Sequence, residues 1–140
     1  MSSENHLAAL REINEQAAFN RWAGLVVARA EPGEVELRLT WRDDFGQYNG
    51  FMHAGVIGAL IDTACGFAAY TAVGSVLASH FSVNCLAPAR GKHFIVVGHI
   101  VKAGRKQVFT TAELFADTQD RQLLVASGQA ILVPTAAHQT

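Results

Sequence analysis

The chain has 140 residues, half of them hydrophobic and only 16% charged, with a formal net charge of -1. This length fits one compact domain, so we expect a single domain over residues 1–140, with a helix in residues 1–20 and a tail at 134–140. A near-neutral chain lacks the excess positive charge that holds nucleic-acid phosphates, so no nucleic-acid partner is expected. So high an apolar content predicts additional apolar surface buried between subunits.

The N-terminal segment is polar and lacks the apolar centre of a signal peptide. Residues 3–20 predict a helix that begins at Ser3 as N-cap. Its apolar positions recur at helical spacing: Leu7, Leu10, Ile13 and Ala17. Cys65 and Cys85 lie in apolar stretches without metal or redox spacing, so we interpret both as small core residues in a reducing compartment. Together these features predict a cytoplasmic protein.

Two strands are predicted at residues 25–30 and 34–40, joined by a Glu-Pro-Gly turn. The second alternates apolar and charged residues, as a half-buried strand does. A loop rich in Asp, Gly and Asn covers residues 42–52.

Residues 53–73 predict a long helix that is apolar nearly all the way round and is therefore enclosed on most sides. Gly55, Gly58 and Gly66 each cost this helix up to about 1 kcal/mol relative to alanine. We expect them to permit close approach of a neighbouring backbone. Asp62 and the lack of flanking positive charge argue against a membrane span.

Four further strands are predicted at residues 77–86, 93–102, 107–117 and 122–133, with short turns at 103–105 and 118–120. A helix that needs covering and strands that need a partner layer are both satisfied by an antiparallel sheet curled around one central helix. The sequence therefore predicts the α+β class.

Asp62 is the first candidate for chemistry. A carboxylate on an apolar helix is destabilising unless it is paired, and burial raises its pKa. From its position alone, a structural hydrogen bond to a backbone amide and a catalytic role are equally good explanations.

The start of this helix is the second candidate. Backbone N–H groups of a first helical turn have no helical partner and lie at the positive end of the helix dipole, so they can bind a developing oxyanion. Taken alone, His53 is better explained as a hydrogen-bonding residue at the helix start than as a chemical base.

Together these features resemble the PaaI-type and 4-hydroxybenzoyl-CoA-type hotdog thioesterases, in which a polar loop residue precedes a His-Gly-Gly helix start and an acid. Here the pattern is Gln47, His53-Ala54-Gly55 and Asp62. The resemblance includes segments 82–91 and 101–105 and spans roughly residues 22–133. It implies a hotdog fold, with an antiparallel sheet wrapped around one long central helix, and it implies that the domain acts as an acyl-CoA thioesterase.

The resemblance also implies roles for individual residues. Asp62 would attack the thioester carbonyl or activate a water, and the Ala54 amide would polarise the carbonyl oxygen. Gln47 would help to place the thioester or the water, and His53 would belong to the same catalytic group. Asn49 and Gly55 would contact the substrate.

The sequence departs from the family pattern at two positions. Ala54 replaces the middle glycine of His-Gly-Gly, which keeps its N–H but adds a methyl group. Ala78 stands where many relatives have Ser or Thr near the attacking water. Neither Ser79 nor His80 obviously replaces that hydroxyl.

Helix geometry gives an independent argument about the site. The nine residues from His53 to Asp62 correspond to about 13.5 Å of rise and about 180° of rotation. Asp62 and the Ala54 amide are therefore expected on opposite sides of the helix, too far apart to act on one carbonyl. If both are catalytic, the site combines two subunits, in a homodimer or a homotetramer.

Basic residues concentrate after the helix, and no acid lies between Asp62 and Glu113 to offset them. Their positive charge suits the phosphates of coenzyme A, although solvated surface explains any single one equally well. The predicted CoA contacts are Arg90, Lys92, Arg105 and Lys106. CoA is part of the substrate, so no separate cofactor is expected. His93 and His99 lack further ligands, so no metal site is expected either.

Two other functions fit the same fold. A hotdog dehydratase or hydratase would need a His acting with an acid, and the Asp-x-Asn-Pro-x-His run of the hydratases is absent from residues 44–53. A protein that binds acyl-CoA without turnover would explain Ala54 and Ala78.

Overall fold

The computed structural model describes residues 2–135, and this part of the chain forms three α-helices, two short 3-10 helices and six strands. The helices are α1 (Ser3–Gln16), α2 (Ala18–Ala23) and α3 (Ala54–Val73). The 3-10 helices are Asp43–Phe45 and Tyr48–Gly50. The strands are β1 (Val26–Glu31), β2 (Glu34–Thr40), β3 (Val76–Cys85), β4 (His93–Ala103), β5 (Val108–Asp117) and β6 (Gln122–Pro134).

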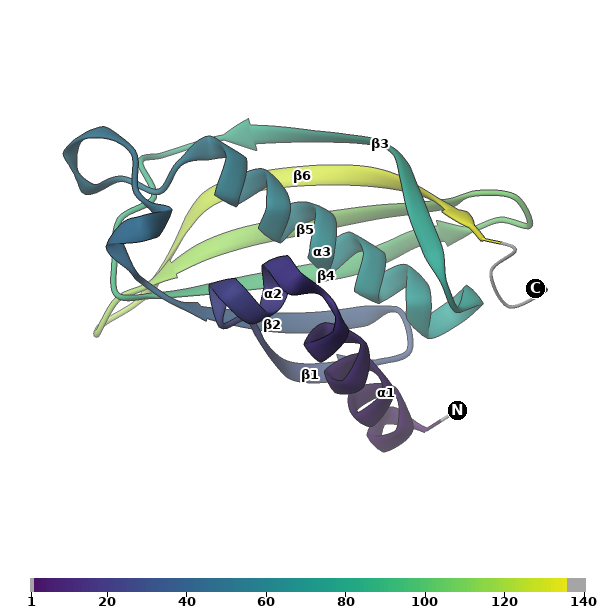
Figure 1. Cartoon of the computed structure of the whole chain (residues 1–140). Helices are drawn as coiled ribbons and strands as arrows, with labels where there is room; N and C mark the ends of the chain where they lie inside the picture. Colours follow the sequence, from purple (N-terminus) through teal and green to yellow (C-terminus); the bar gives the residue numbers. More distant parts are fainter. Residues whose placement is uncertain (1, 136–140) are drawn as a thin grey trace.

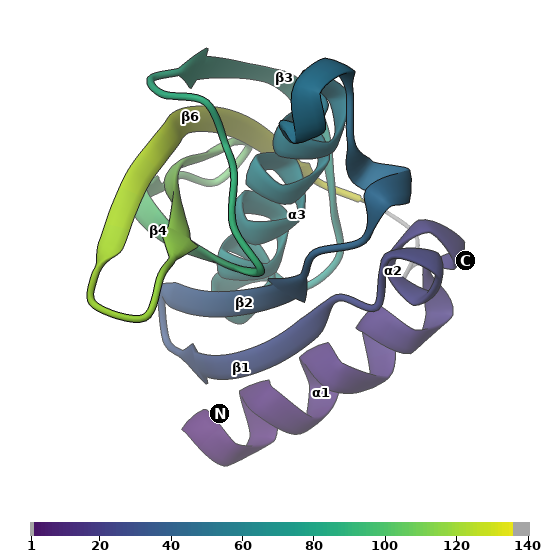
Figure 2. The same cartoon turned by 90° about the vertical axis from the view of Figure 1, so that its left-hand side faces the viewer.

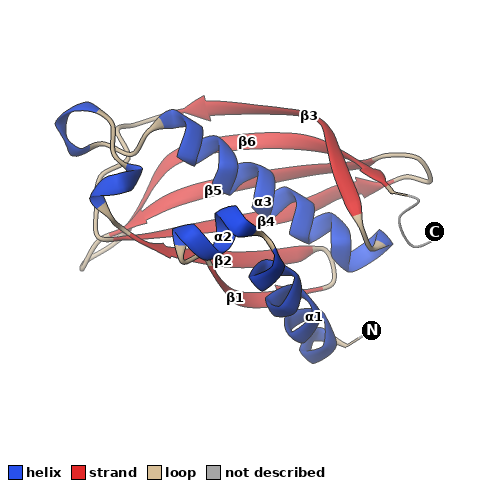
Figure 3. Cartoon of the chain, in the orientation of Figure 1, coloured by secondary structure: helices blue, strands red, loops and turns tan. Residues whose placement is uncertain are grey.

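The strands of the described chain make one antiparallel sheet in the order β1-β2-β4-β5-β6-β3. The sheet lies behind α3 in Figure 1 and curls around it when seen along the helix in Figure 2. Figure 3 shows that α1 and α2 flank the β1 edge, while β3 forms the other edge. The predicted α+β class, with an antiparallel sheet around one long helix, is confirmed.

Alternation in β2 follows the sequence prediction. Val35, Leu37 and Leu39 are buried in the core, while the intervening charged side chains face outward. Gly33, with a φ of +82°, makes the turn between β1 and β2 in the left-handed region that favours glycine. Local sequence signals therefore suffice to predict this hairpin.

Two strand glycines bring the sheet close to α3. A Cβ on Gly98 in β4 would lie 2.3 Å from the backbone oxygen of Ala64, and one on Gly128 in β6 would lie 2.5 Å from the Ser82 oxygen and 2.7 Å from an Ile61 methyl. Only glycine permits this approach. The strand glycines therefore fix the depth at which α3 sits.

Within residues 2–135 the three helix glycines do not serve this purpose, so the predicted close approach of a neighbouring backbone is not met in the single chain. A Cβ on Gly55 would meet the His53 imidazole, one on Gly58 would meet the Phe81 ring, and one on Gly66 would meet nothing within 4 Å beyond the adjoining helix backbone. No neighbouring backbone lies at any of the three in the described residues.

The sheet covers only one side of α3. Ile57, Leu60, Ile61, Ala64 and Cys65 are among the buried residues on that side. Within the described chain, the other side stays half-buried: Val56, Ala59, Asp62, Thr63, Gly66, Phe67 and Tyr70. α3 is long and apolar enough to cross a membrane by length and composition, but its contacts with the strands are those of a core helix.

The N-terminal helix differs from the prediction in two ways. Its N-cap is Ser2 and not Ser3, because the Ser2 hydroxyl accepts the Asn5 N–H at 3.3 Å. The predicted helix over residues 3–20 also breaks at Ala17, whose φ of -88° and ψ of 118° are extended, so α2 is a separate helix. The predicted tail begins within β6, which includes Pro134, and residues 136–140 lie outside the described chain.

Cys65 is buried in the core as predicted, but the prediction for Cys85 is wrong because its side chain is exposed. Cys85 ends β3, the edge strand, which has no neighbouring strand on its outer side within residues 2–135. Several side chains of β3 are exposed with it, including Leu77 (70% exposed) and Phe81 (48% exposed).

Candidate active site

The start of α3 is capped by His53. Its Nδ1 accepts the Gly55 N–H at 2.8 Å, and its carbonyl oxygen accepts the N–H groups of Val56 and Ile57. The Ala54 N–H has no hydrogen-bond acceptor within residues 2–135. Of the first-turn donors, Ala54 is therefore the one left to bind a ligand oxygen.

A tight loop precedes this helix start and carries Gln47. The Gln47 N–H donates to the Phe51 carbonyl at 2.7 Å, which closes the loop around Asn49 and Gly50. Both central residues have a positive φ, 63° and 75°. Asn49 is therefore a turn residue, and its side chain is exposed.

Arg90 holds the same loop in place. Its guanidinium donates to the Asn49 carbonyl at 2.8 Å and lies 4.7 Å from the centre of the Phe51 ring. A guanidinium over an aromatic face is attracted by the ring electrons. Arg90, predicted as a CoA contact, thus already has a contact with the loop that carries Gln47.

Gln47 and Ala54 line one pocket, which we call the Ala54 pocket. It has a volume of about 420 Å³ and lies between the helix start and the segment that follows β3. Its lining residues are Gln47, Phe51, Met52, Ala54, Ile57, Cys85, Leu86, Ala87, Pro88 and Ala89. This is the segment where the sequence resembles the family's Pro-Ala turn.

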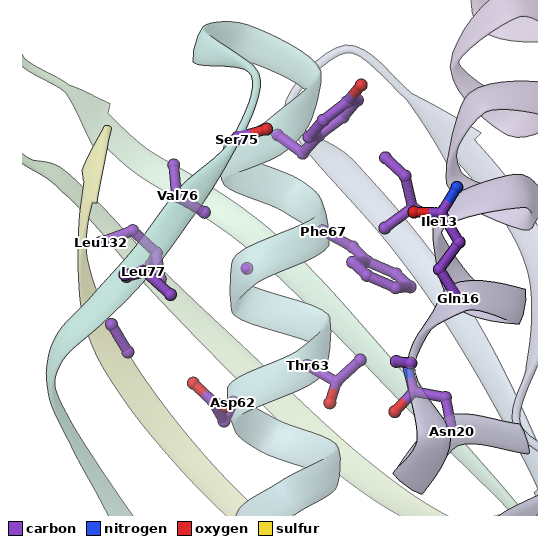
Figure 4. A pocket seen from close by; sticks show the side chains of 14 residues that line it. Ile13, Gln16, Asn20, Asp62, Thr63, Phe67, Ser75, Val76, Leu77 and Leu132 are labelled. Atoms are coloured by element: carbon purple, nitrogen blue, oxygen red, sulfur yellow. The ribbon is translucent and has the colours of Figure 1, made fainter. Parts of the chain in front are cut away.

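Asp62 lines a second pocket, the Asp62 pocket, also of about 420 Å³. In Figure 4 its carboxylate lies on the side of α3 nearer Leu77 of β3, while Thr63 and Phe67 point toward α1 and α2. The lining residues are Ile13, Gln16, Ala17, Asn20, Asp62, Thr63, Gly66, Phe67, Tyr70, Ser75, Val76, Leu77, Ala78 and Leu132. A largely apolar pocket that contains one carboxylate suits an apolar ligand with a reactive polar end.

The electrostatics of the Asp62 pocket favour a basic carboxylate. Burial raises the pKa of Asp62 above its ordinary value. Burial also raises the pKa of the neighbouring Cys65 thiol to about 11, with the Asp62 charge adding to the effect. Among the described residues that line this pocket, Asp62 is the only carboxylic acid, and it holds its proton more tightly than an exposed aspartate does.

The two pockets are separated along α3. The helix begins at Ala54, so Asp62 follows eight residues later, at about 12 Å of rise and about 80° of rotation. The prediction of opposite helix faces is therefore wrong, because it counted rotation from His53, which lies before the helix. Distance along the axis still prevents the Ala54 N–H and Asp62 of one chain from reaching one carbonyl.

Ala78 lines the Asp62 pocket, and neither of its neighbours supplies the missing hydroxyl. Ser79 is the extra residue of a bulge in β3, and its hydroxyl donates to the Ile131 carbonyl at 3.3 Å. His80 is exposed and lines a different pocket with Phe109. The hydroxyl groups that do line the Asp62 pocket are those of Thr63, Tyr70 and Ser75.

The basic residues do not form one cluster in the described chain. Arg90 and Lys92 precede β4, while Arg105 and Lys106 follow it. The 11 residues of β4 are about 35 Å long, so the two pairs lie at opposite ends of the sheet. Arg90 and Lys92 are at the end that holds the start of α3, and Arg105 and Lys106 are at the end that holds the start of β3.

Within residues 2–135, no three His, Cys, Asp or Glu side chains lie together as metal ligands would. His99 instead pairs with a carboxylate, with its Nδ1 2.9 Å from the Glu34 oxygen.

Solved structures with the same arrangement define the class of fold. The chain superposes on a thioesterase family protein from Silicibacter pomeroyi with a TM-score of 0.87 and 30% identity, covering 91% of this chain and 96% of that one. It superposes on the E. coli PaaI protein of the phenylacetic acid degradation operon with a TM-score of 0.86, 17% identity and 96% of both chains covered. The protein therefore has the hotdog fold that the sequence resemblance implied.

Sequence comparison gives the family. The sequence model of the thioesterase superfamily matches residues 49–122. The Halobacterium salinarum protein named "Putative esterase VNG_1336C" is 30% identical over 118 residues, which cover 75% of this chain and 78% of that protein. The chain belongs to the thioesterase superfamily.

Proposed function

We propose that the protein hydrolyses acyl-CoA or aryl-CoA thioesters to the free acid and CoA, with Asp62 as the catalytic carboxylate. The observation that carries the proposal is Asp62 itself, a half-buried carboxylate on an apolar helix that lines an apolar cavity. No hydrogen bond to the Asp62 side chain is found in the described chain. The structural alternative, in which this carboxylate accepts a hydrogen bond from a backbone amide, therefore has no support there. A carboxylate of raised pKa is a better base or nucleophile than an exposed one.

In this reaction Asp62 adds to the thioester carbonyl or removes a proton from the water that adds to it. Either route sends an electron pair onto the carbonyl oxygen, and the free Ala54 N–H would stabilise this oxyanion. Gln47, in the same pocket as Ala54, would orient the thioester or the water. The C–S bond then breaks, the CoA thiolate takes up a proton, and in the direct route water cleaves the Asp62 anhydride. His53, which caps the helix, would keep the Ala54 N–H in position.

We propose that each site is built from two subunits, in a homodimer or a tetramer of two such dimers. Three features of the single chain support this. The Ala54 and Asp62 pockets are too far apart to share a carbonyl, the outer side of α3 is only half-buried, and β3 is an exposed edge strand with Leu77 and Phe81 in the open. A second copy with β3 beside β3 would pair the unsatisfied edge and supply the missing half-site.

We propose that the exposed basic residues bind the phosphates of the CoA moiety. Asn49 and Gly55 would contact the substrate near its reacting end. Lys92, Arg105 and Lys106 are exposed. Arg90 is also exposed, and its guanidinium donates a hydrogen bond to the Asn49 carbonyl. Because CoA arrives as part of the substrate, the proposal requires no further cofactor, nucleic acid or membrane. The exposed free thiol of Cys85 fits the reducing cytoplasm that we propose as its location.

Ala78 favours a second candidate, a protein that binds acyl-CoA without turnover. This residue leaves a methyl group beside Asp62 where many relatives of the resembled family have a hydroxyl. Binding of acyl-CoA without release of free thiol would support this candidate over hydrolysis.

The first test is a thiol-release assay across aryl, short-chain and long-chain CoA esters. We expect turnover of at least one ester, and a loss of at least about 10² in kcat for Asp62→Asn while the protein stays folded. Glu113→Gln is the matched control, because Glu113 is also half-buried but lines a pocket apart from that of Asp62. Near-normal hydrolysis by Asp62→Asn would remove Asp62 from the catalytic machinery.

A further inference from the structure

Gly66 lies one helical turn beyond Asp62 and lines the same pocket. Residues four apart share one side of a helix, so Gly66 and Asp62 face the cavity together. A Cβ built on Gly66 meets no heavy atom within 4 Å beyond the adjoining helix backbone. Space is therefore open at this position in the single chain.

A glycine in the middle of a helix lowers helix stability relative to alanine, so its presence needs a reason. Packing within the described chain does not supply one, in contrast to Gly98, where a Cβ would lie 2.3 Å from the Ala64 oxygen. Gly58 of the same helix is also constrained, since its Cβ would lie 3.3 Å from the Phe81 ring. Gly66 alone of these three faces an open cavity that holds the reactive carboxylate.

We infer that Gly66 determines which acyl groups the protein accepts, by leaving room for the part of the acyl group that extends past Asp62. This inference rests on the proposed function, because it takes Asp62 as the point of attack. Four residues of helix rise by about 6 Å, so Gly66 lies about that far from Asp62 along the axis. An acetyl group ends before this point, while a six-carbon chain or an aromatic ring reaches it.

The surface beyond Gly66 suits such a group. Phe67 and Ile13 supply apolar surface on one side, and Leu77 and Leu132 supply it on the other, as Figure 4 shows. Acyl groups of six or more carbons, straight or aromatic, would fill this space and gain from the apolar contact. Short acyl groups would leave it empty.

The test uses Gly66→Ala and Gly66→Val, with hexanoyl-CoA, benzoyl-CoA and acetyl-CoA as substrates. We expect the ratio of kcat/KM for hexanoyl-CoA to that for acetyl-CoA to fall at least tenfold in Gly66→Val, and to fall less in Gly66→Ala. Ala72→Val is the matched control, because Ala72 is exposed on the same helix and does not line the pocket. Its ratio should stay at the wild-type value.

A binding measurement separates this inference from the proposed function. The non-hydrolysable thioethers hexyl-CoA and ethyl-CoA should show the same discrimination by calorimetry, with hexyl-CoA binding weakened at least tenfold more than ethyl-CoA binding in Gly66→Val. Suppose that Gly66→Val weakens hexyl-CoA binding more than ethyl-CoA binding, but the wild-type protein hydrolyses no CoA ester. The hydrolase proposal then fails and the role of Gly66 stands. If Gly66→Val weakens both thioethers equally, or changes the mass of the oligomer in solution instead, Gly66 serves a subunit contact and the inference is overturned.

Discussion

At the scale of single residues, Asp62 occupies a position where a neutral side chain would be more stable. Burial raises its pKa, so the folded protein holds the Asp62 proton more tightly than the unfolded chain does. Above the raised pKa the carboxylate is charged, and its desolvation lowers the free energy of unfolding. The penalty is relieved as the pH falls through the raised pKa toward the ordinary value for aspartate.

Asp62→Asn should therefore raise the melting temperature at neutral pH, because the amide has no charge to desolvate. The difference from wild type should shrink as the pH falls and vanish once Asp62 is protonated in both states. Thermal denaturation of both proteins between pH 4 and pH 8 measures this difference. A difference that grows on acidification would mean that the folded protein stabilises the charged form.

His53 is predicted as a member of the catalytic group, and the structure gives it the role of N-cap. The cap needs an acceptor for the Gly55 N–H, which the imidazole Nδ1 provides at 2.8 Å. Asparagine is a strong N-cap residue and supplies an acceptor too, whereas alanine does not.

We expect His53→Ala to lower the free energy of unfolding by about 1 kcal/mol. His53→Asn should restore both this stability and most of the thioesterase kcat, since it restores the helix start that holds the Ala54 N–H. Urea unfolding and steady-state kinetics on the two variants provide the comparison. An asparagine variant that is stable but as inactive as the alanine variant would mean that the imidazole itself takes part in the chemistry.

At the scale of elements, the sequence predicts the strands and the central helix to within one or two residues. Alternation in β2 and the long apolar run of α3 are strong local patterns, and both are bounded by Gly, Pro or turn residues. The break at Ala17 could not be predicted, because residues 3–20 contain no glycine or proline to mark it. At the break the Ala17 N–H donates to the Asn14 carbonyl at 3.3 Å, and α1 and α2 take different directions (Figure 2).

The role of the strand glycines was missed, although the sequence carries a signal for it. A glycine within a strand pattern often marks close approach of another backbone. Gly98 and Gly128 are both such residues, and each faces α3 or β3 at contact distance. The sequence prediction considered only the glycines of α3, so it did not assign close backbone approach to the strands β4 and β6.

The β4–β5 turn carries Arg105 and Lys106, whose predicted role is contact with CoA phosphates. Changing both to glutamine should raise KM for a CoA ester far more than for a short pantetheine thioester, which lacks the nucleotide phosphates. Exposed charges contribute little to stability, so the fold should be unaffected. Arg121→Gln, in the β5–β6 turn, is the control for loss of an exposed charge.

Equal increases in KM for both thioesters would show that Arg105 and Lys106 are solvated surface. Arg90→Gln is expected to behave differently from the turn variants. Because Arg90 contacts the loop that carries Gln47, its loss should lower kcat for both substrates in addition to any change in KM.

At the scale of the whole molecule, the candidate site is only partly readable from the sequence. The family pattern locates Asp62, Ala54 and Gln47, and the structure gives each of them a pocket. The other wall of the Asp62 pocket comes from Ile13 and Asn20 in the N-terminal helices, about fifty residues earlier in the chain. No local pattern predicts which helix face packs across a cavity that far away in sequence.

The division of the site into two pockets is the central claim about the assembly. One chain presents the Ala54 N–H and Gln47 in one pocket and Asp62 in another. Eight residues of helix, about 12 Å, separate the two groups, so under the proposed function a working site would take Asp62 from one subunit and the helix start from its partner. Each dimer would then hold two sites of this composite kind.

Mixing two inactive variants tests this claim most directly. One subunit carries Asp62→Asn, the other carries Gln47→Ala with His53→Ala, and different affinity tags allow the heterodimer to be purified. Each homodimer should be nearly inactive, while the heterodimer should recover about half of the wild-type thioesterase activity, because one of its two sites is intact and the other carries both lesions. A purified, folded heterodimer that remains as inactive as its parents would contradict a site shared between subunits.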